Sequence, residues 1–134
     1  MEKYQIRLYD MRRASETEGV VLADEGESSD EIILTITVEN HAVTAKADDY
    51  FSAYQELRDR LLKIGFGLKC NGSRINATQS AMMSYTPKVY LVEMGRQALR
   101  KDIVDIWGDC DITCFPDTEE QNQYIDTWRA SLRT

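Results

Sequence analysis

The sequence has few cysteines and no long hydrophobic run. Its three cysteines, Cys70, Cys110 and Cys114, are low and odd in number, which argues against a disulfide framework and favours reduced thiols in a cytosol. No apolar run approaches the length needed to cross a bilayer, and the first residues lack the apolar core of a signal peptide. We therefore expect a cytoplasmic protein that does not bind membranes.

Motifs of several common activities are also missing. The chain has no GxGxxG or Walker sequence for a nucleotide and no Ser/His/Asp order typical of a hydrolase. Cys110 and Cys114 are separated by three residues, which is off the spacing of zinc sites, and His41 is the single histidine that could join them. The sequence therefore predicts no metal and no cofactor, indicates no catalytic residue, and favours a protein that is not an enzyme.

Acidic residues are in excess. The chain of 134 residues contains 23 acidic and 16 basic residues, which gives a formal net charge of −7. This charge repels phosphate backbones, so we expect no nucleic-acid partner. It would attract a basic protein, although a net charge of this size also keeps a small domain soluble.

The segment from residue 14 to residue 30 has many acidic residues, small residues typical of loops and no basic residue. Only residues 20–22 are apolar enough to form a brief strand. Because neighbouring acidic residues repel one another, the sequence predicts a long, mobile acidic loop. Its candidate binding residues are Glu16, Glu18, Asp24, Glu25 and Glu27.

Alternation of apolar and polar residues predicts strands in several places. The clearest run covers residues 32–38, and a second run over 43–47 follows a turn at Asn40 and His41, which indicates a hairpin. Residues 66–70 should form a strand beside that hairpin. Residues 88–94 and 103–107 predict a second hairpin, but residues 96–107 also fit helical spacing, so both structures remain open for that segment.

Two segments have the periodicity of amphipathic helices, from Asp49 to Ile64 and from Asp117 to Leu132. Gly65 is suited to end the first helix, and Glu120 stands three residues after Asp117, as in a capping box. Strands and helices do not alternate strictly. The sequence therefore predicts a single α+β domain over residues 1–134, with one antiparallel or mixed sheet of about five or six strands and two helices packed on it.

The run from Cys70 to Arg74, together with Ser80, is a candidate site at the end of a strand. A cysteine, a serine and an arginine could supply a nucleophile and an anion clamp. Cys70 also closes an alternating strand, where a small buried hydrophobic residue is the simplest interpretation. Asn71, Arg74 and Ser80 remain candidate binding residues.

Several short segments of the second half of the chain resemble a family of small bacterial proteins with no known activity. The likeness rests on the Cys-Asn-Gly-Ser-Arg turn, on a Ser-x-Met loop, and on later matches at residues 89–90, 94–96 and 103–107. The family typically has Tyr-Pro-Ser-Gly-Met in the loop, whereas this chain has Ala81 between Ser80 and Met82. The resemblance implies interest in Asn71, Arg74 and Ser80 but brings no activity.

Three functions are compatible with these observations. The preferred hypothesis is a protein-binding module of the toxin-neutralising immunity type, which would use the acidic loop to occlude a basic partner protein. The alternative is a small enzyme, or a protein that binds an anion or small ligand, centred on residues 70–80. A third hypothesis, a subunit of a larger assembly, predicts a large exposed apolar patch.

Overall fold

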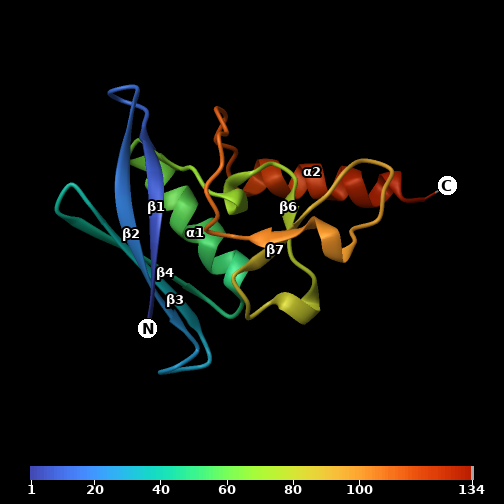
Figure 1. Ribbon diagram of the computed structural model, residues 1–134, viewed down its shortest axis with the longest axis horizontal. Helices are drawn as coiled ribbons and strands as arrows, with labels where there is room; N and C mark the ends of the chain where they lie inside the picture. Colours follow the sequence, from blue (N-terminus) through green and yellow to red (C-terminus); the bar gives the residue numbers. More distant parts are fainter. Residues whose placement is uncertain (134) are drawn as a thin grey trace.

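The computed structural model describes residues 1–133 and shows two antiparallel sheets with two α-helices, which confirms the predicted α+β class (Figure 1). The main sheet has five strands in the order β4-β3-β2-β1-β5, and a smaller sheet has the order β6-β7-β8. The bounds are β1 Glu2–Asp10, β2 Ser15–Glu25, β3 Ile32–Val38, β4 His41–Ala47, α1 Tyr50–Lys63, β5 Phe66–Leu68, β6 Ala77–Thr78, β7 Lys88–Leu91, β8 Ile103–Asp105 and α2 Thr118–Ser131.

The expectation of a single sheet is wrong because the chain leaves the main sheet just after β5. The short 3₁₀ helix η1, Asn71–Ser73, turns the backbone there. The amide N–H groups of Asn71 and Gly72 donate to the carbonyl oxygens of Gly108 and Ile106 instead of to the main sheet. These bonds connect the end of β5 to the chain that follows β8, so the later strands form a separate sheet.

The predicted mobile acidic loop at residues 14–30 is also wrong. Residues 15–25 form β2, the longest strand, which lies between β1 and β3. Val21 and Ala23 of β2 are fully buried, and the ladder to β1 extends over the first nine residues of the strand. Burial and backbone pairing outweigh repulsion among its exposed acidic residues, so that, within the predicted loop, only Ala14 and the segment from Gly26 onward lie outside the strand.

The hairpin of β3 and β4 is confirmed, but its two-residue turn is at Glu39 and Asn40, one residue earlier than predicted, and His41 is the first residue of β4. Both turn residues have positive φ, 49° and 67°, as a turn that matches the twist of a hairpin requires. The sequence predicted that the strand of residues 66–70 lies beside this hairpin. Instead, β5 pairs with β1, at the opposite edge of the sheet. Hydrogen bonds from Met11 N to Gly65 O and from Lys69 N to Arg7 O extend that pairing.

Both helices begin and end as predicted. The Asp49 side chain caps α1 by accepting from Ser52 N at 2.8 Å, and Gly65 follows the helix with a φ of 91°. The capping box of Asp117 and Glu120 opens α2. Five hydrophobic residues of α1, which packs on the main sheet, are fully buried: Tyr50, Ala53, Tyr54, Leu57 and Leu61. The helix α2 lies beside α1, on the side away from that sheet (Figure 1).

Of the segment from residue 96 to residue 107, only Ile103–Asp105 form a strand, within the predicted strand of residues 103–107. The strand β8 pairs antiparallel with β7, and the helical periodicity produces only a single 3₁₀ turn, η3, at Arg100–Asp102. A second 3₁₀ turn, η2, covers Ala81–Met83, where the sequence predicted a short helix from residue 77. Among residues 1–133, no helix is long and apolar enough to cross a membrane.

Candidate functional site

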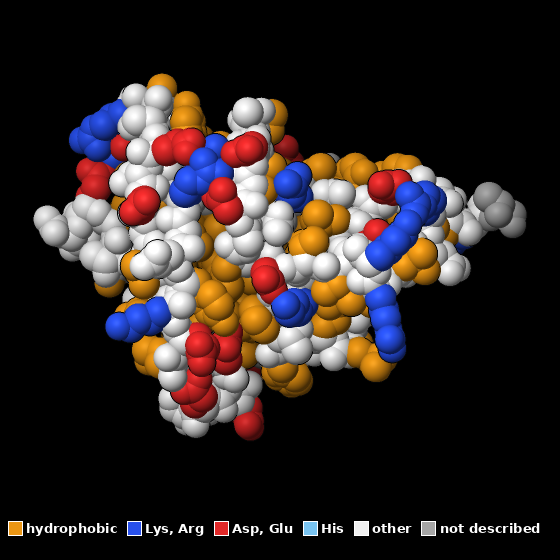
Figure 2. Space-filling model, in the orientation of Figure 1, with side chains coloured by type: hydrophobic (Ala, Val, Ile, Leu, Met, Phe, Trp, Pro, Cys, Tyr) orange, Lys and Arg blue, Asp and Glu red, His pale blue; other side chains and the backbone are white. Residues whose placement is uncertain are grey.

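Acidic residues from separate parts of the chain gather at one end of the main sheet. The strand register places the end of β2, the start of β3 and the end of β4 side by side, because Glu25 pairs with Ile32 and Ile32 with Ala47. Glu2 joins them through its pairing with Ala23. We call this group the acidic end; it comprises Glu2, Asp24, Glu25, Glu27, Asp30, Glu31, Asp48 and Asp49. Figure 2 shows acidic side chains crowded over the β2–β3 turn.

Some residues of the acidic end have structural roles. The Asp24 carboxylate accepts hydrogen bonds from the amide of Glu27 at 2.9 Å and from the hydroxyl of Ser28, and these bonds lower its pKa. Glu27 forms an ion pair with the terminal ammonium group of Met1. Asp30 is exposed and makes no side-chain hydrogen bond or ion pair with any residue from 1 to 133. A binding partner would therefore meet the exposed carboxylates while Asp24 shapes the turn that presents them.

Glu25 connects the acidic end to an aromatic cluster. Its carboxylate accepts hydrogen bonds from Tyr4 Oη at 2.9 Å and Tyr50 Oη at 2.6 Å, and Trp107 Nε1 donates to Tyr50 Oη at 2.9 Å. The ring of Tyr4 stacks on Trp107 with centroids 5.6 Å apart. Partial burial and the carboxylate raise the pKa of Tyr4 to about 12, and burial raises the pKa of Tyr50 further.

The raised pKa of Tyr4 makes stability depend on pH under alkaline conditions. Its folded-state pKa of about 12 lies above the ordinary value of 10, so the neutral phenol is favoured in the folded protein. The stabilisation is complete below pH 10 and is lost as the pH rises through 12. We expect the urea midpoint to fall over this interval, and to fall less in Tyr4→Phe, in which the dependence that remains comes from Tyr50 and Tyr54, whose pKa values burial also raises. A Tyr4→Phe protein with the same alkaline loss would contradict this assignment.

Glu16 and Glu18 do not belong to the acidic end. Both residues lie near the start of β2. Glu16 precedes Glu25 by nine residues, which corresponds to roughly 30 Å along a strand. Glu16 accepts from Arg7 at 2.7 Å and from Lys69 at 3.2 Å, and these cations lower its pKa. Arg7 also binds Asp109, with 2.5 Å between Nε and Oδ1. Glu16 therefore belongs to an ion network that joins β1, β2 and the chain after β8.

Two large apolar side chains stand exposed next to the acidic end. Met82 is 98% exposed and Tyr85 is 65% exposed. Their loop is held on the first turn of α1, because Tyr50 N donates to Ser84 O at 2.6 Å and Phe51 N donates to Gln79 Oε1 at 3.1 Å. Since Asp48 and Asp49 immediately precede that turn, the loop adjoins the acidic end, and Figure 2 shows hydrophobic side chains beside the acidic group.

The candidates near residue 70 separate into two places. Asn71 Oδ1 accepts from Arg74 Nε at 3.1 Å, and Arg74 borders a hollow of about 510 Å³ next to Phe115 and Glu120. Ser80 instead lines a different hollow between the two helices. Cys70 is fully buried, which raises the pKa of its thiol and disfavours the reactive thiolate. The structure thus joins Asn71 with Arg74 and leaves Ser80 apart from them.

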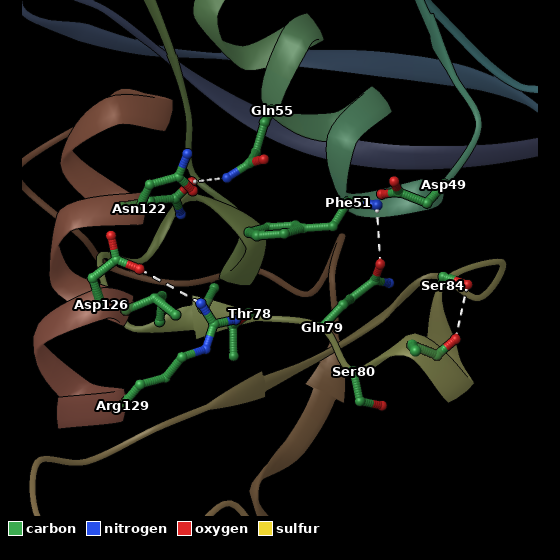
Figure 3. A pocket seen from close by; sticks show the side chains of 14 residues that line it. Asp49, Phe51, Gln55, Thr78, Gln79, Ser80, Ser84, Asn122, Asp126 and Arg129 are labelled. Atoms are coloured by element: carbon green, nitrogen blue, oxygen red, sulfur yellow. Dashed lines mark hydrogen bonds and ion pairs between the residues drawn. The ribbon is translucent and has the colours of Figure 1, made fainter. Parts of the chain in front are cut away.

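The hollow that contains Ser80 has a volume of about 420 Å³ and was not predicted from the sequence (Figure 3). One wall comes from α2, where Asn122, Asp126 and Arg129 recur at spacings of four and three and therefore share a helix face. That spacing was the available signal. The sequence predicted only the apolar stripe of the same helix.

No protein-family model matches the chain, and a comparison with curated proteins finds no match. Within residues 1–133, no group of three or more His, Cys, Asp or Glu side chains is placed to hold a metal ion. The support for a function therefore comes from the surfaces and hollows of the chain itself.

Proposed function

We propose that this protein is a protein-binding module that contacts a basic partner through the acidic end and the adjoining loop of residues 80–86. The observation that carries the proposal is that the loop with Met82 and Tyr85, two exposed apolar side chains, is hydrogen-bonded to the first turn of α1, which directly follows Asp48 and Asp49 of the acidic end. Methionine and tyrosine are enriched in the cores of protein interfaces, whereas charged residues form their rims. The surface thus has both parts of an interface.

The charges and the apolar side chains would have different effects on binding. Exposed carboxylates such as Asp30, together with the net charge of −7, would accelerate encounter with a basic protein. Burial of Met82 and Tyr85 would then slow dissociation, because apolar area removed from water stabilises the complex. We propose that the module acts by occluding its partner, as an immunity protein of the toxin-neutralising type does.

Neutralising the acidic end should weaken binding by about tenfold, since exposed charges contribute fractions of a kcal/mol each. The test variant is Asp30→Asn/Glu31→Gln/Asp48→Asn, and the matched control, Glu18→Gln/Glu93→Gln/Glu119→Gln, changes the net charge equally. Each protein would capture partners from its native cytosol, and the Kd of a purified partner would be measured at about 50 and about 300 mM salt. The wild type and the control should bind alike. The proposal fails if no captured protein distinguishes the test variant from the control.

Met82→Ala/Tyr85→Ala provides a second measurement on the same complex. Both side chains are exposed in the free protein, so their removal should leave the fold unchanged. We expect the dissociation rate to rise by at least tenfold while the association rate stays nearly constant. An unchanged dissociation rate would remove the loop of residues 80–86 from the interface.

A further inference from the structure

The hollow between the helices has the size and lining of a small-ligand site. Its volume of about 420 Å³ lies within the range that holds small molecules. Apolar residues that are almost completely buried, Phe51, Ala77 and Ile125, form part of its lining. Figure 3 shows Gln55, Asn122, Asp126 and Arg129 arranged around the ring of Phe51. The hollow therefore combines an aromatic surface with polar groups from both helices.

A buried chain of side-chain amides fixes which atom of Gln55 faces the hollow. Gln121 is fully buried and its Nε2 donates to Gly72 O at 2.9 Å and Arg74 O at 2.7 Å. Its Oε1 must then be the acceptor, which receives Arg58 Nη2 at 2.6 Å. Gln55 can satisfy that oxygen only with its own Nε2, at 3.1 Å. The Oε1 of Gln55 is consequently directed away from Gln121.

The Oε1 atom of Gln55 accepts no hydrogen bond from any residue between 1 and 133. The residue as a whole is only 9% exposed. This oxygen atom is not enclosed in the core. Among residues 1–133, Nη1 of Arg58 is the one buried side-chain nitrogen or oxygen atom without a hydrogen-bond partner. An acceptor that borders a hollow, is open to solvent and has no partner in the protein can receive a hydrogen bond from a ligand that donates one.

The remaining polar groups favour a neutral ligand over an anion. Arg129 and Asp126 offset each other's charge, with 3.5 Å between Nη1 and Oδ1, and the Asp49 carboxylate that caps α1 is the one further charge of the lining. The lining nevertheless offers donors, from Arg129 and Asn122, as well as acceptors, from Asp126 and Gln55. A hydroxyl group both donates and accepts, so several hydroxyls on one small molecule fit this mixture better than a single charge does.

We propose that this hollow binds a neutral, polyhydroxylated ligand of monosaccharide size, with one hydroxyl donating to Gln55 Oε1 and the carbon face of the ring lying against Phe51. The hollow shares Asp49, Ser80, Ala81 and Ser84 with the protein-binding surface proposed above, so the variants that test it are placed on Gln55 and on α2, outside that surface.

The experiment is a titration of the ¹⁵N-labelled full chain, observed by NMR, with D-glucose, D-galactose and N-acetyl-D-glucosamine. We expect at least one sugar to shift the amide signals of residues around the hollow, with a Kd of about 1–10 mM for a ligand of this size. Tetrahydropyran, which has the ring without the hydroxyls, should not bind. Inorganic phosphate and L-lysine test whether a charged ligand is preferred.

Two variants localise the binding. Gln55→Ala removes the unpaired acceptor and should weaken sugar binding by about tenfold, the effect of losing one polar contact in a desolvated site. Asn122→Ala removes an exposed wall residue that no core contact needs, and its matched control on the same helix is Gln123→Ala. Binding should weaken in Asn122→Ala and stay unchanged in Gln123→Ala, even if Gln55→Ala unfolds.

Several results would overturn the proposal. One is the absence of any change in the amide signals at a sugar concentration of about 50 mM, which is above the expected Kd. Another is that tetrahydropyran shifts the same signals as much as the sugars do. Tighter binding of phosphate or lysine in the hollow, or unchanged sugar affinity in Asn122→Ala, would do the same. None of these results concerns capture of a protein partner, so the two proposals can fail separately.

Discussion

Replacing Gln121 by leucine should lower the free energy of unfolding by about 4 kcal/mol, because the substitution leaves several buried polar groups without partners. The amide of Gln121 makes four hydrogen bonds: with Gln55, Arg58, Gly72 O and Arg74 O. Arg58 is only 1% exposed and already has one nitrogen without a partner. After the substitution its guanidinium would retain only Thr118 and Asp59.

Urea denaturation followed by circular dichroism measures this effect. Gln123→Leu is the matched control, since Gln123 is exposed on the same helix and its substitution should change stability by less than about 0.5 kcal/mol. A loss below about 1 kcal/mol in Gln121→Leu would show that the amide network contributes little to stability. The double variant Arg58→Met/Gln121→Leu should be less destabilised than the sum of its single substitutions, because the two side chains share a hydrogen bond.

Gly72→Ala should destabilise the protein by about 3 kcal/mol through overpacking. A Cβ atom at this position would lie 2.6 Å from Ile106 Cγ1 and 2.8 Å from two ring atoms of Tyr54. Both neighbours are fully buried, and the hydroxyl of Tyr54 is hydrogen-bonded to Ser73 at 2.6 Å. Neither side chain can move away without disturbing the core, and Gly72 itself is held by a bond from its N–H to Ile106 O.

The same denaturation experiment tests the cause of this loss. Ile106→Ala removes the nearest atom, so the double variant Gly72→Ala/Ile106→Ala should be destabilised less than the two single variants combined. Additive losses would mean that the alanine methyl group does not meet Ile106. A Gly72→Ala protein as stable as the wild type would show that the backbone can shift to accept the methyl group at η1.

The two helices and the hairpin of β3 and β4 could be predicted because their signals are local. Asp49 and Gly65 mark the ends of α1, and the capping box of Asp117 and Glu120 marks the start of α2. Each signal depends on residues within one turn of one another. The strand β2 could not be predicted in the same way, because its acidic first half resembles a loop and its pairing with β1 and β3 is non-local.

The candidate sites show the same division. The residue composition indicated an acidic protein with two places worth testing, and it supplied the candidates Asp24, Glu25 and Glu27, which the structure retains at the acidic end. It could not separate Glu16 and Glu18 from them, since closeness along the chain does not fix closeness in space. In an extended strand, nine residues place two carboxylates roughly 30 Å apart.

The sequence by itself therefore determined the charge, the α+β class and the ends of both helices, all of which depend on composition or on contacts between near neighbours. Only the tertiary structure decided that strand register assembles the acidic end from residues 2, 24–31 and 48–49 beside the loop of residues 80–86. It also decided that Gln55 and α2 enclose one hollow. Such groupings depend on which strands pair and which helix faces meet, and these choices are fixed by burial of the whole core.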